Sequence, residues 1–277
     1  MTAPLHPVAL HPVALHGAPR SGTTWLGEIF NSHPQVRYAF QPMFSYAFKE
    51  FLGPDPDAAR IAAFWEALAQ SDDAFIRQAE KRADGRLPDF GTSAPTHLVY
   101  KEVRHHHLLP VLMARAPTLR AVLIVRDPRA VISSWLRAPR EFRADLGWRV
   151  EEEWRAAPSK NLGRAEEFNG FDRWKDATRI FLDLAAAHPQ RVALIRYADL
   201  LADPDAGVAG LFDLCGLEVT DRTTAFLHAG TRADPSDPYG VDARRRADTG
   251  WRDRLDPGIA EEIAADLAGT PLAAFLD

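Results

Sequence analysis

The fold of this chain is decided by the stretch HGAPRSGTTW at residues 16–25. The apolar run Val13–Leu15 before it predicts a short buried strand, and Gly22–Phe30 carries apolar residues at helical spacing. A strand, a glycine-containing turn and a helix N-terminus leave free N–H groups and the positive end of a helix dipole at one point. The stretch therefore predicts an anion site; the alternative is an ordinary Gly-Ser turn before a helix.

The same stretch has the layout of a phosphate-binding loop but not its chemistry. Glycines stand at 17 and 22, and Thr24 stands where such a loop keeps the Ser or Thr that binds Mg²⁺. Thr23, however, stands where a nucleoside triphosphatase keeps its Lys, and the cation has moved back to Arg20. Without that lysine the loop suits a triphosphate poorly. It suits a single phosphate that carries a neighbouring anionic group.

Further strands and helices alternate along the chain. The predicted strands are Val36–Phe40, Leu98–Arg104, Leu119–Val125 and Val192–Tyr197. The predicted helices cover about 56–82, 106–115, 128–137, 171–187, 205–215 and 257–269. This alternation predicts an α/β protein of three layers in a P-loop-type arrangement, with a central, mostly parallel sheet flanked by helices. Ligands are expected at the carboxyl ends of its strands.

The chain is expected to form a single domain over residues 1–277, because no stretch has the composition of a linker. Residues 1–11 are expected to be flexible. The segments 139–170 and 228–250 are polar with little periodicity, and we expect long loops or lids there.

Charge and composition exclude several classes of protein. The formal net charge of −5 argues against general nucleic-acid binding. The single cysteine, Cys215, excludes an internal disulfide and is expected in the core. No apolar run approaches the ~18 residues of a membrane span, and no signal peptide is evident, so a cytoplasmic protein is expected.

A second anion site is predicted at VRDPRAVISSW, residues 125–135. Asp127 can cap a helix that Pro128 begins, with Arg126 at the end of the preceding strand and Ser134 two turns along the helix. Arg126 and Ser134 would bind one phosphate together; a structural Arg–Asp pair at the strand end is the alternative. Two phosphate sites on neighbouring strand ends fit a nucleotide phosphorylated at both ends.

With these motifs the chain resembles the sulfotransferases that use 3′-phosphoadenosine 5′-phosphosulfate (PAPS) and release adenosine 3′,5′-bisphosphate (PAP). PRSGTTW resembles the family's 5′-phosphosulfate loop, and VRDPRAVISS resembles its 3′-phosphate motif. RYADLLADP at 196–204 resembles a third segment, which usually has Glu where Ala198 stands. The order of a strand ending in KEVR, a helix and the strand LIVRDPR resembles the carbohydrate-type branch in particular.

The resemblance implies roles for individual residues. Arg20 would contact the 5′-phosphosulfate and its bridging oxygen. Further donors would come from the N–H and hydroxyl groups of Ser21, Gly22, Thr23 and Thr24. Trp25 would pack on the adenine, while Arg126 and Ser134 would bind the 3′-phosphate. The arginines at 244–246 resemble a late basic segment that closes over the same phosphate, with Arg244 and Arg245 as candidates; a solvated arginine run is the alternative.

The resemblance leaves the catalytic base open. The carbohydrate-type branch has a Glu-Pro pair after its second strand, but this chain has Gln41-Pro42, and Gln has no basic group. In the cytosolic branch a catalytic His follows a Lys by two residues, where this chain has Val103 after Lys101. Of the nearest histidines, at 105–107, we favour His105. Gln41 would orient the acceptor, and Lys101 would contact a sulfate oxygen or pair with a carboxylate.

Transfer is expected to proceed in line and without a metal, since Arg20 and the helix N-terminus can neutralise charge on the leaving oxygen. The three adjacent histidines point in different directions, so we expect no metal site there. The acceptor is expected to be a hydroxyl-bearing small molecule or glycan. The aromatic segment 38–48 is either its pocket or core beneath a loop. No oligomeric state is predicted.

Two other functions remain open. One is a P-loop nucleotide kinase or nucleoside triphosphatase, which requires Mg²⁺. The other is a protein that binds PAPS or PAP but has lost its base, as Gln41 suggests.

Overall fold

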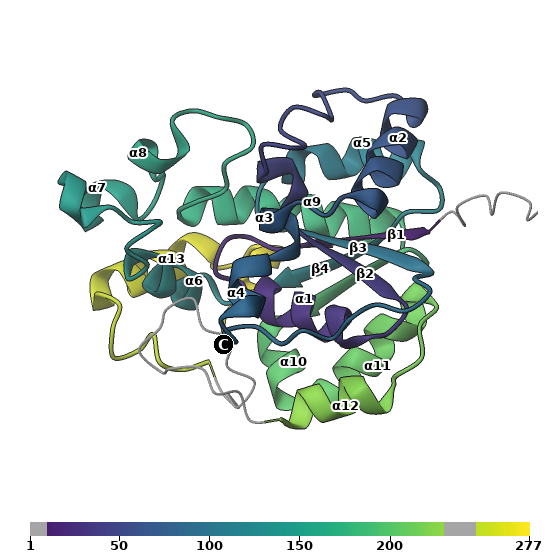
Figure 1. The fold of residues 1–277 in the computed structure, drawn as a ribbon. Helices are drawn as coiled ribbons and strands as arrows, with labels where there is room; N and C mark the ends of the chain where they lie inside the picture. The colour runs from purple at the N-terminus through teal and green to yellow at the C-terminus, as the bar shows by residue number, and fades with distance from the viewer. Residues whose placement is uncertain (1–9, 230–247) are drawn as a thin grey trace, which may run out of the picture.

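The computed structural model describes residues 10–229 and 248–277. Its centre is a five-stranded sheet with the strand order β2-β3-β1-β4-β5, and all its neighbouring strands run parallel (Figure 1). The strands are β1 (His11–His16), β2 (Val36–Phe40), β3 (His97–Glu102), β4 (Arg120–Val125) and β5 (Val192–Arg196). The predicted sheet is therefore confirmed, and its described strands are parallel throughout.

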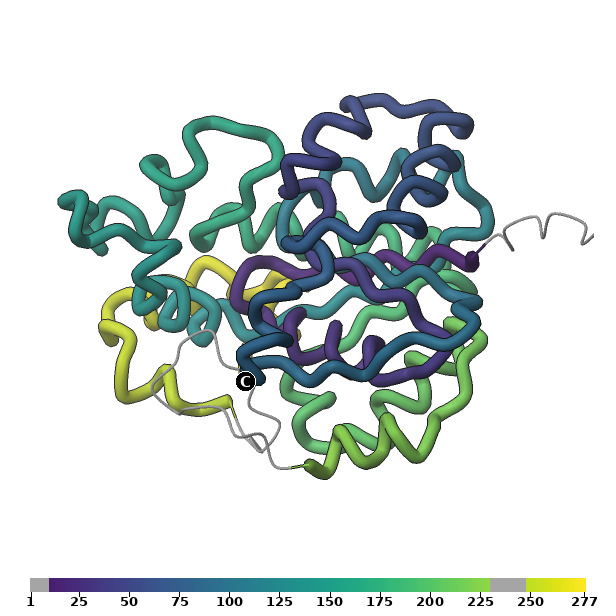
Figure 2. Tube along the Cα trace, viewed as in Figure 1, coloured from purple at the N-terminus to yellow at the C-terminus, as the bar shows by residue number. Residues whose placement is uncertain are grey.

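Helices cover both faces of the sheet, which confirms the three-layer α/β architecture (Figure 1, Figure 2). One layer consists of α1 (Thr23–Ser32), α10 (Tyr197–Ala202), α11 (Pro204–Cys215) and α12 (Asp221–His228). The other contains α2 (Ala58–Gln70), α5 (Leu109–Arg115), α6 (Pro128–Leu136), α9 (Phe171–Ala187) and α13 (Pro257–Leu267). Cys215 is buried in the first of these layers, as expected.

Alternate side chains of each strand enter different cores, because successive residues of a strand point to opposite faces. On β3, Val99 belongs to the core beneath α1, whereas Tyr100 belongs to the core beneath α9. Lys101 therefore points to the α1 face and Glu102 to the α9 face. Two charged neighbours in the sequence are thus separated by the sheet.

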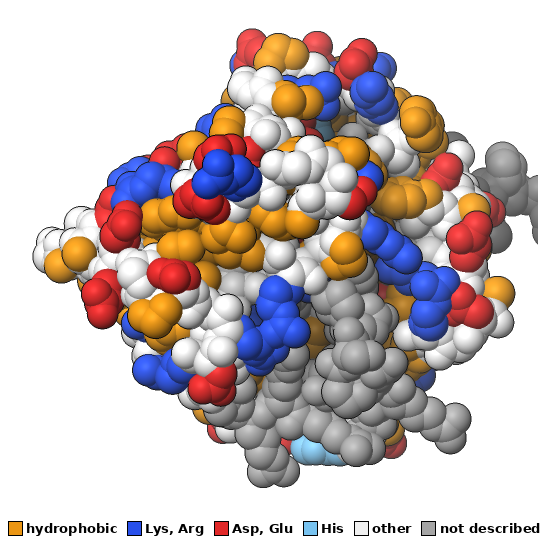
Figure 3. Space-filling model, turned by 90° about the vertical axis from the view of Figure 1, so that its left-hand side faces the viewer, with side chains coloured by type: hydrophobic (Ala, Val, Ile, Leu, Met, Phe, Trp, Pro, Cys, Tyr) orange, Lys and Arg blue, Asp and Glu red, His pale blue; other side chains and the backbone are white. Residues whose placement is uncertain are grey.

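The carboxyl ends of the strands meet at one edge. His16 lies opposite Glu102, and Phe40 lies opposite Lys101. The connections that leave β1, β2, β3 and β4 therefore emerge side by side. Figure 3 looks at the molecule from the side toward which β1 runs, and there Lys and Arg side chains gather at the centre, beside an apolar band.

The helix predicted over about 56–82 is wrong in one respect, because three helices occupy this region. They are α2, α3 (Ala74–Arg77) and α4 (Ala79–Ala83). Asp73 begins α3 by accepting a hydrogen bond from the Ile76 N–H, and Gln78 at φ 53° ends it. A side-chain cap and a left-handed residue thus override the apolar periodicity that runs through them.

The segment 139–170 was expected to be a long loop, and it contains short helices. After a 3-10 turn at Ala144–Leu146 come α7 (Val150–Glu153) and α8 (Pro158–Asn161). Figure 2 shows this part of the chain standing out from the body of the sheet. The expectations for 1–11 and 228–250 fall largely on residues outside those described.

Among residues 10–229 and 248–277, no helix is long and apolar enough to cross a membrane. The cytoplasmic location stays a prediction.

Candidate active site

The loop between β1 and α1 has a backbone that only glycine tolerates at one position. Gly22 has φ 88°, and a Cβ placed on it would lie 2.4 Å from Cε2 of Tyr197. Arg20 also adopts a left-handed conformation, with φ 71°. Tyr197 begins α10 at the end of β5, so the turn is shaped by a ring from a distant part of the chain.

The loop presents donors that the described residues do not use. α1 begins at Thr23, with Gly22 as an N-cap that makes no side-chain hydrogen bond. The N–H groups of residues 22–25 find no acceptor within residues 10–229 and 248–277. The Ser21 hydroxyl oxygen is buried and has no partner among the same residues. An anion placed at this helix N-terminus would satisfy these groups, so the loop fits the predicted phosphosulfate site.

Arg20 links this loop to the second motif. Its Nε lies 3.1 Å from Ser134 Oγ, on α6, and its Nη1 lies 3.2 Å from Oε1 of Glu141. Its carbonyl oxygen accepts a hydrogen bond from Nη1 of Arg126 at 2.7 Å. The structure therefore brings Arg20, Ser134 and Arg126 together, as the two motifs require.

Arg126 is nearly buried and is held from several sides. Nε and Nη2 donate to the two carboxylate oxygens of Asp248 at 2.5 and 2.6 Å, and the guanidinium lies 5.0 Å from the Tyr197 ring centroid. Burial acts to lower the pKa of Arg126, but the hydrogen bonds and charge of Asp248 outweigh burial and raise this pKa. Asp127 caps α6 and pairs instead with Arg129, so the acid that pairs with Arg126 is not its sequence neighbour.

Trp25 lies in the core rather than open to a ligand. Its side chain is 5% exposed, and its ring meets Tyr197 edge-on with the centroids 6.2 Å apart. Its contact with adenine stays a prediction. Thr23 is also buried, whereas Gly22 and Thr24 are partly exposed. Arg244 and Arg245 lie outside the described residues.

Lys101 is buried at the end of β3 on the α1 face. Its Nζ lies 4.4 Å from the centroid of the Phe40 ring, and no carboxylate of the described residues forms a salt bridge with it. Burial lowers the pKa of Lys101 to about 7, against the opposing charges of Glu102 and Glu141, while Lys81 and Arg20 lower this pKa further. The carboxylate partner that the sequence left open is absent at salt-bridge distance among these residues.

His105 lies in the connection between β3 and α5. His105 stands at φ 57° before a 3-10 turn, and its N–H donates to the Glu166 carbonyl at 3.1 Å. Burial lowers the pKa of His105 to about 4, as does His107, and Glu166 opposes this shift. Its role as the base stays a prediction. His106 faces the interior instead, with Nδ1 2.9 Å from Nδ1 of His16.

Gln41 lies where β2 ends. It has φ 42°, and its N–H donates to the Lys101 carbonyl at 2.8 Å. This bond ties the end of β2 to the end of β3. The orienting role predicted for the Gln41 side chain stays a prediction.

Three acidic residues of this region were not singled out from the sequence. Glu141 contacts Arg20, Asp248 contacts Arg126, and Glu102 is fully buried at the end of β3. Glu102 Oε1 accepts the Met43 N–H at 2.8 Å, while Oε2 has no partner among the described residues. Only Glu102 had a signal in the sequence, since it is a charge at the end of an apolar strand.

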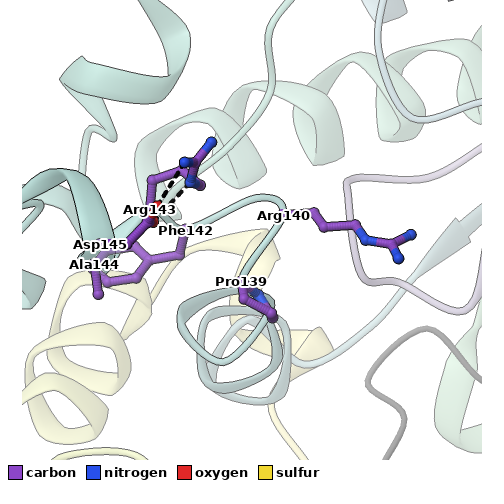
Figure 4. A pocket seen from close by; sticks show the side chains of 6 residues that line it. All are labelled: Pro139, Arg140, Phe142, Arg143, Ala144 and Asp145. Carbon is purple, nitrogen blue, oxygen red and sulfur yellow. Dashed lines mark hydrogen bonds and ion pairs between the residues drawn. The ribbon is translucent and has the colours of Figure 1, made fainter.

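The loop that carries Glu141 also borders a surface hollow of about 450 Å³. Figure 4 shows that Arg140 extends to one side of this loop, while Phe142, Arg143 and Asp145 point to the other. The hollow is lined by Pro139, Arg140, Phe142, Arg143, Ala144 and Asp145.

Residues 12–221 match the family model described as "Sulfotransferase family". The chain belongs to this family. It is an enzyme that moves a sulfuryl group from PAPS to an acceptor and leaves PAP, and the kinase and the non-catalytic alternatives are not favoured. Within the described residues, no group of three or more His, Cys, Asp or Glu side chains could hold a metal ion.

Curated relatives of this sulfotransferase include two human proteins. Carbohydrate sulfotransferase 6 of Homo sapiens is 24% identical over 82% of this chain and 68% of its own length. Carbohydrate sulfotransferase 5 of Homo sapiens is 26% identical over 85% of this chain and 70% of its own length. These relatives agree with the resemblance to the carbohydrate-type branch.

Solved structures show the same fold. Mouse sulfotransferase SULT7A1, complexed with PAP, covers 95% of this chain and 86% of its own at a TM-score of 0.53 and 14% identity. The sulfotransferase domain of the Synechococcus PCC 7002 olefin synthase covers 94% of this chain and 95% of its own, at a TM-score of 0.51 and 18% identity.

Proposed function

We propose that this sulfotransferase transfers the sulfuryl group of PAPS, in line and without a metal, to a hydroxyl of a glycan. The observation that supports it most is the convergence of Arg20, Ser134 and Arg126 at the N-terminus of α1. These three side chains and the free N–H groups of α1 can bind two anionic groups of one nucleotide. The carbohydrate sulfotransferases among its relatives support a glycan as the acceptor.

The donor would lie across the sheet edge between α1 and α6. Arg20, Ser21 and the N–H groups of residues 22–24 would bind the 5′-phosphosulfate, and Trp25 would contact the adenine. Arg126 and Ser134 would bind the 3′-phosphate. Arg126 is already buried beside the Tyr197 ring, and the 3′-phosphate would take the place of the Asp248 carboxylate on its guanidinium.

The same groups would stabilise the leaving oxygen. Sulfuryl transfer resembles phosphoryl transfer, in which positioning and charge neutralisation supply most of the catalysis. The Arg20 guanidinium and the positive end of α1 would lie beside this oxygen. Lys101 approaches from β3, and with a pKa near 7 it can carry a proton to a sulfate oxygen.

An aromatic surface beside Lys101 supports a sugar or an aromatic ring as acceptor. Phe40 lies under Lys101 Nζ, and its ring centroid is 5.6 Å from that of Phe75. Phe75 in turn lies 5.7 Å from Phe44, and these two rings are 40% and 47% exposed. Arg104 lies over Phe44, with Cζ 4.2 Å from the ring centroid. The surface therefore combines apolar faces with a cationic hydrogen-bond donor, as a small-molecule or glycan site does.

Calorimetric titration of PAP into the EDTA-treated protein tests the donor site, with AMP and ATP in parallel. We expect tight binding of PAP and weak binding of the other two, because only PAP offers both phosphates to Arg20 and Arg126. A preference for ATP, or no binding of PAP, would contradict the proposal.

Transfer of labelled sulfuryl groups to neutral oligosaccharides and to phenols tests the acceptor class. We expect sulfated oligosaccharides, and we expect Phe44→Ala to raise the KM for them while leaving the affinity for PAP unchanged. Tyr46→Ala is the matched control, because Tyr46 is an aromatic residue of the same segment and is 98% exposed. Transfer to phenols alone would contradict the glycan assignment.

A further inference from the structure

Glu141 is held in place by the segment that follows α6. Its N–H donates to the Ala138 carbonyl at 2.8 Å, and so does that of Phe142. The Phe142 ring is buried, 5.5 Å from the Trp135 ring centroid and 6.0 Å from that of Trp148. The backbone beside Glu141 is therefore anchored, while its side chain is 25% exposed and reaches the sheet edge.

The Glu141 carboxylate contacts the loop between β1 and α1. Its Oε1 is 3.2 Å from Nη1 of Arg20. Its charge opposes the burial that lowers the pKa of Lys101 to about 7. Burial and the charge of Arg104 lower the pKa of Lys160, and the charges of Glu167 and Glu141 oppose this lowering. Glu141 thus contacts Arg20 directly, and its charge acts on Lys101 and Lys160.

The other candidate bases fit this position less well. Gln41 has an amide in place of a carboxylate. His105 has His107, Glu166 and Arg104 as the charged groups acting on it, rather than Arg20. Glu102 points to the opposite face of the sheet, where Oε1 is occupied by the Met43 N–H. Of the described carboxylates, Glu141 is the one in direct contact with Arg20.

We propose that Glu141 is the general base of the transfer, supplying the carboxylate that Gln41 lacks. This inference rests on the proposed function. The Glu141 carboxylate takes the proton of the acceptor hydroxyl while the acceptor oxygen forms its bond to sulfur. The bond between sulfur and the bridging oxygen breaks, and its electron pair stays on the 5′-phosphate of PAP, next to Arg20. The proton on Glu141 then passes to solvent, to which this side chain is open.

The contact between Glu141 and Arg20 gives this base its position. Arg20 fixes the carboxylate beside the place where the sulfuryl group is transferred. The donor anion then competes for the guanidinium, and the carboxylate becomes available to the acceptor. A simple counter-ion for Arg20 would also be displaced by the donor, but it would take no part in turnover. The two roles therefore differ in kcat rather than in donor binding.

The test compares Glu141→Gln with Asp145→Asn, using maltotriose and 4-nitrophenol as acceptors. Asp145 is a matched control, because it lies in the same loop and pairs with an arginine, but it is 61% exposed. We expect Glu141→Gln to lower kcat about 100-fold or more with the sugar. With 4-nitrophenol, whose acidic hydroxyl needs little help, we expect a loss below about tenfold. Asp145→Asn leaves both rates unchanged.

PAP titration supplies the readout that does not depend on turnover. Glu141→Gln is expected to bind PAP as tightly as the wild type or more tightly, because a carboxylate that competes for Arg20 is gone. An unchanged kcat with tighter PAP binding would identify a counter-ion only and overturn the proposal. Equal losses with both acceptors would overturn it as well. A wild-type protein that binds no PAP would refute the proposed function itself, and with it the proposed role of Glu141.

Discussion

Arg126 and Asp248 form an ion pair with two hydrogen bonds, at 2.5 and 2.6 Å, in a place assigned to the 3′-phosphate of the donor. Their side chains are 9% and 5% exposed. A carboxylate resembles a phosphate in offering a guanidinium two oxygens in one plane. The Asp248 carboxylate therefore accepts the hydrogen bonds of Arg126 at the place where the 3′-phosphate is expected. We expect the carboxylate and the phosphate to compete for the Arg126 guanidinium.

Asp248→Asn should lower the stability of the free protein and tighten its binding of PAP. The amide leaves a buried guanidinium without its counter-charge, which costs about 1–3 kcal/mol, and it competes less with a phosphate. Thermal unfolding with and without PAP checks this, and the increase in Tm on adding PAP should be larger in the variant. Asp253→Asn is the control, because Asp253 is an exposed residue nearby. Weaker PAP binding by Asp248→Asn would show that Asp248 supports the nucleotide rather than competing with it.

Arg20→Lys should lower kcat about 100-fold while leaving Tm nearly unchanged. A lysine keeps the charge but not the fork that reaches Ser134 and Glu141 together. Steady-state kinetics and thermal unfolding of the variant give both numbers. Arg143→Lys, a surface change at an arginine paired with Asp145, is the control. Full activity of Arg20→Lys would contradict a role of the Arg20 guanidinium in catalysis.

Gly22→Ala should abolish PAP binding, and Gly85→Ala should not. Both glycines have positive φ, 88° and 74°, so both alanines pay about 1 kcal/mol of backbone strain. Only at position 22 does the new Cβ meet another group, the Tyr197 ring, whereas nothing lies within 4 Å at position 85. Calorimetry with PAP separates the two variants, and equal affinities would mean that the Tyr197 contact does not shape the loop.

Glu102→Gln should leave stability nearly unchanged at pH 4 and raise it at pH 9. Burial raises the pKa of Glu102 to about 8, against the opposing effects of the Met43 N–H and Lys101. A raised pKa means that its contribution to stability is present below pH about 4.5 and is lost as pH rises through about 8. Glutamine resembles the protonated form at every pH. Urea unfolding across this range measures the effect, with the exposed Glu66→Gln as control; parallel curves for wild type and Glu102→Gln would contradict it.

Much of the fold could be predicted from local patterns. The strands Val36–Phe40 and Val192–Arg196 and the helix Phe171–Ala187 fall where apolar spacing indicates them, because a buried strand or helix needs an apolar face of fixed period. The region 56–82 shows the limit of this reasoning. A cap at Asp73 and a left-handed Gln78 divide it, and both depend on side-chain geometry rather than on hydrophobic period.

The proposed donor site could also be predicted from the sequence. A strand, a glycine turn and a helix N-terminus determine an anion site by themselves, since the free N–H groups belong to the backbone of one short segment. Arg20, Arg126 and Ser134 belong to two such segments, and parallel strands bring their ends to one edge. Chemistry and topology here follow from contiguous residues.

What the tertiary structure alone decided is which acids face these cations. Glu141 is 121 residues from Arg20, and Asp248 is 122 residues from Arg126. Neither acid stands in a periodic segment, so no local pattern relates it to its partner. The sequence by itself predicted where anions would bind, because backbone geometry near a helix start is local. The fold determined which carboxylates contact these arginines. Residues more than a hundred positions apart in the sequence meet only when the whole sheet edge has assembled.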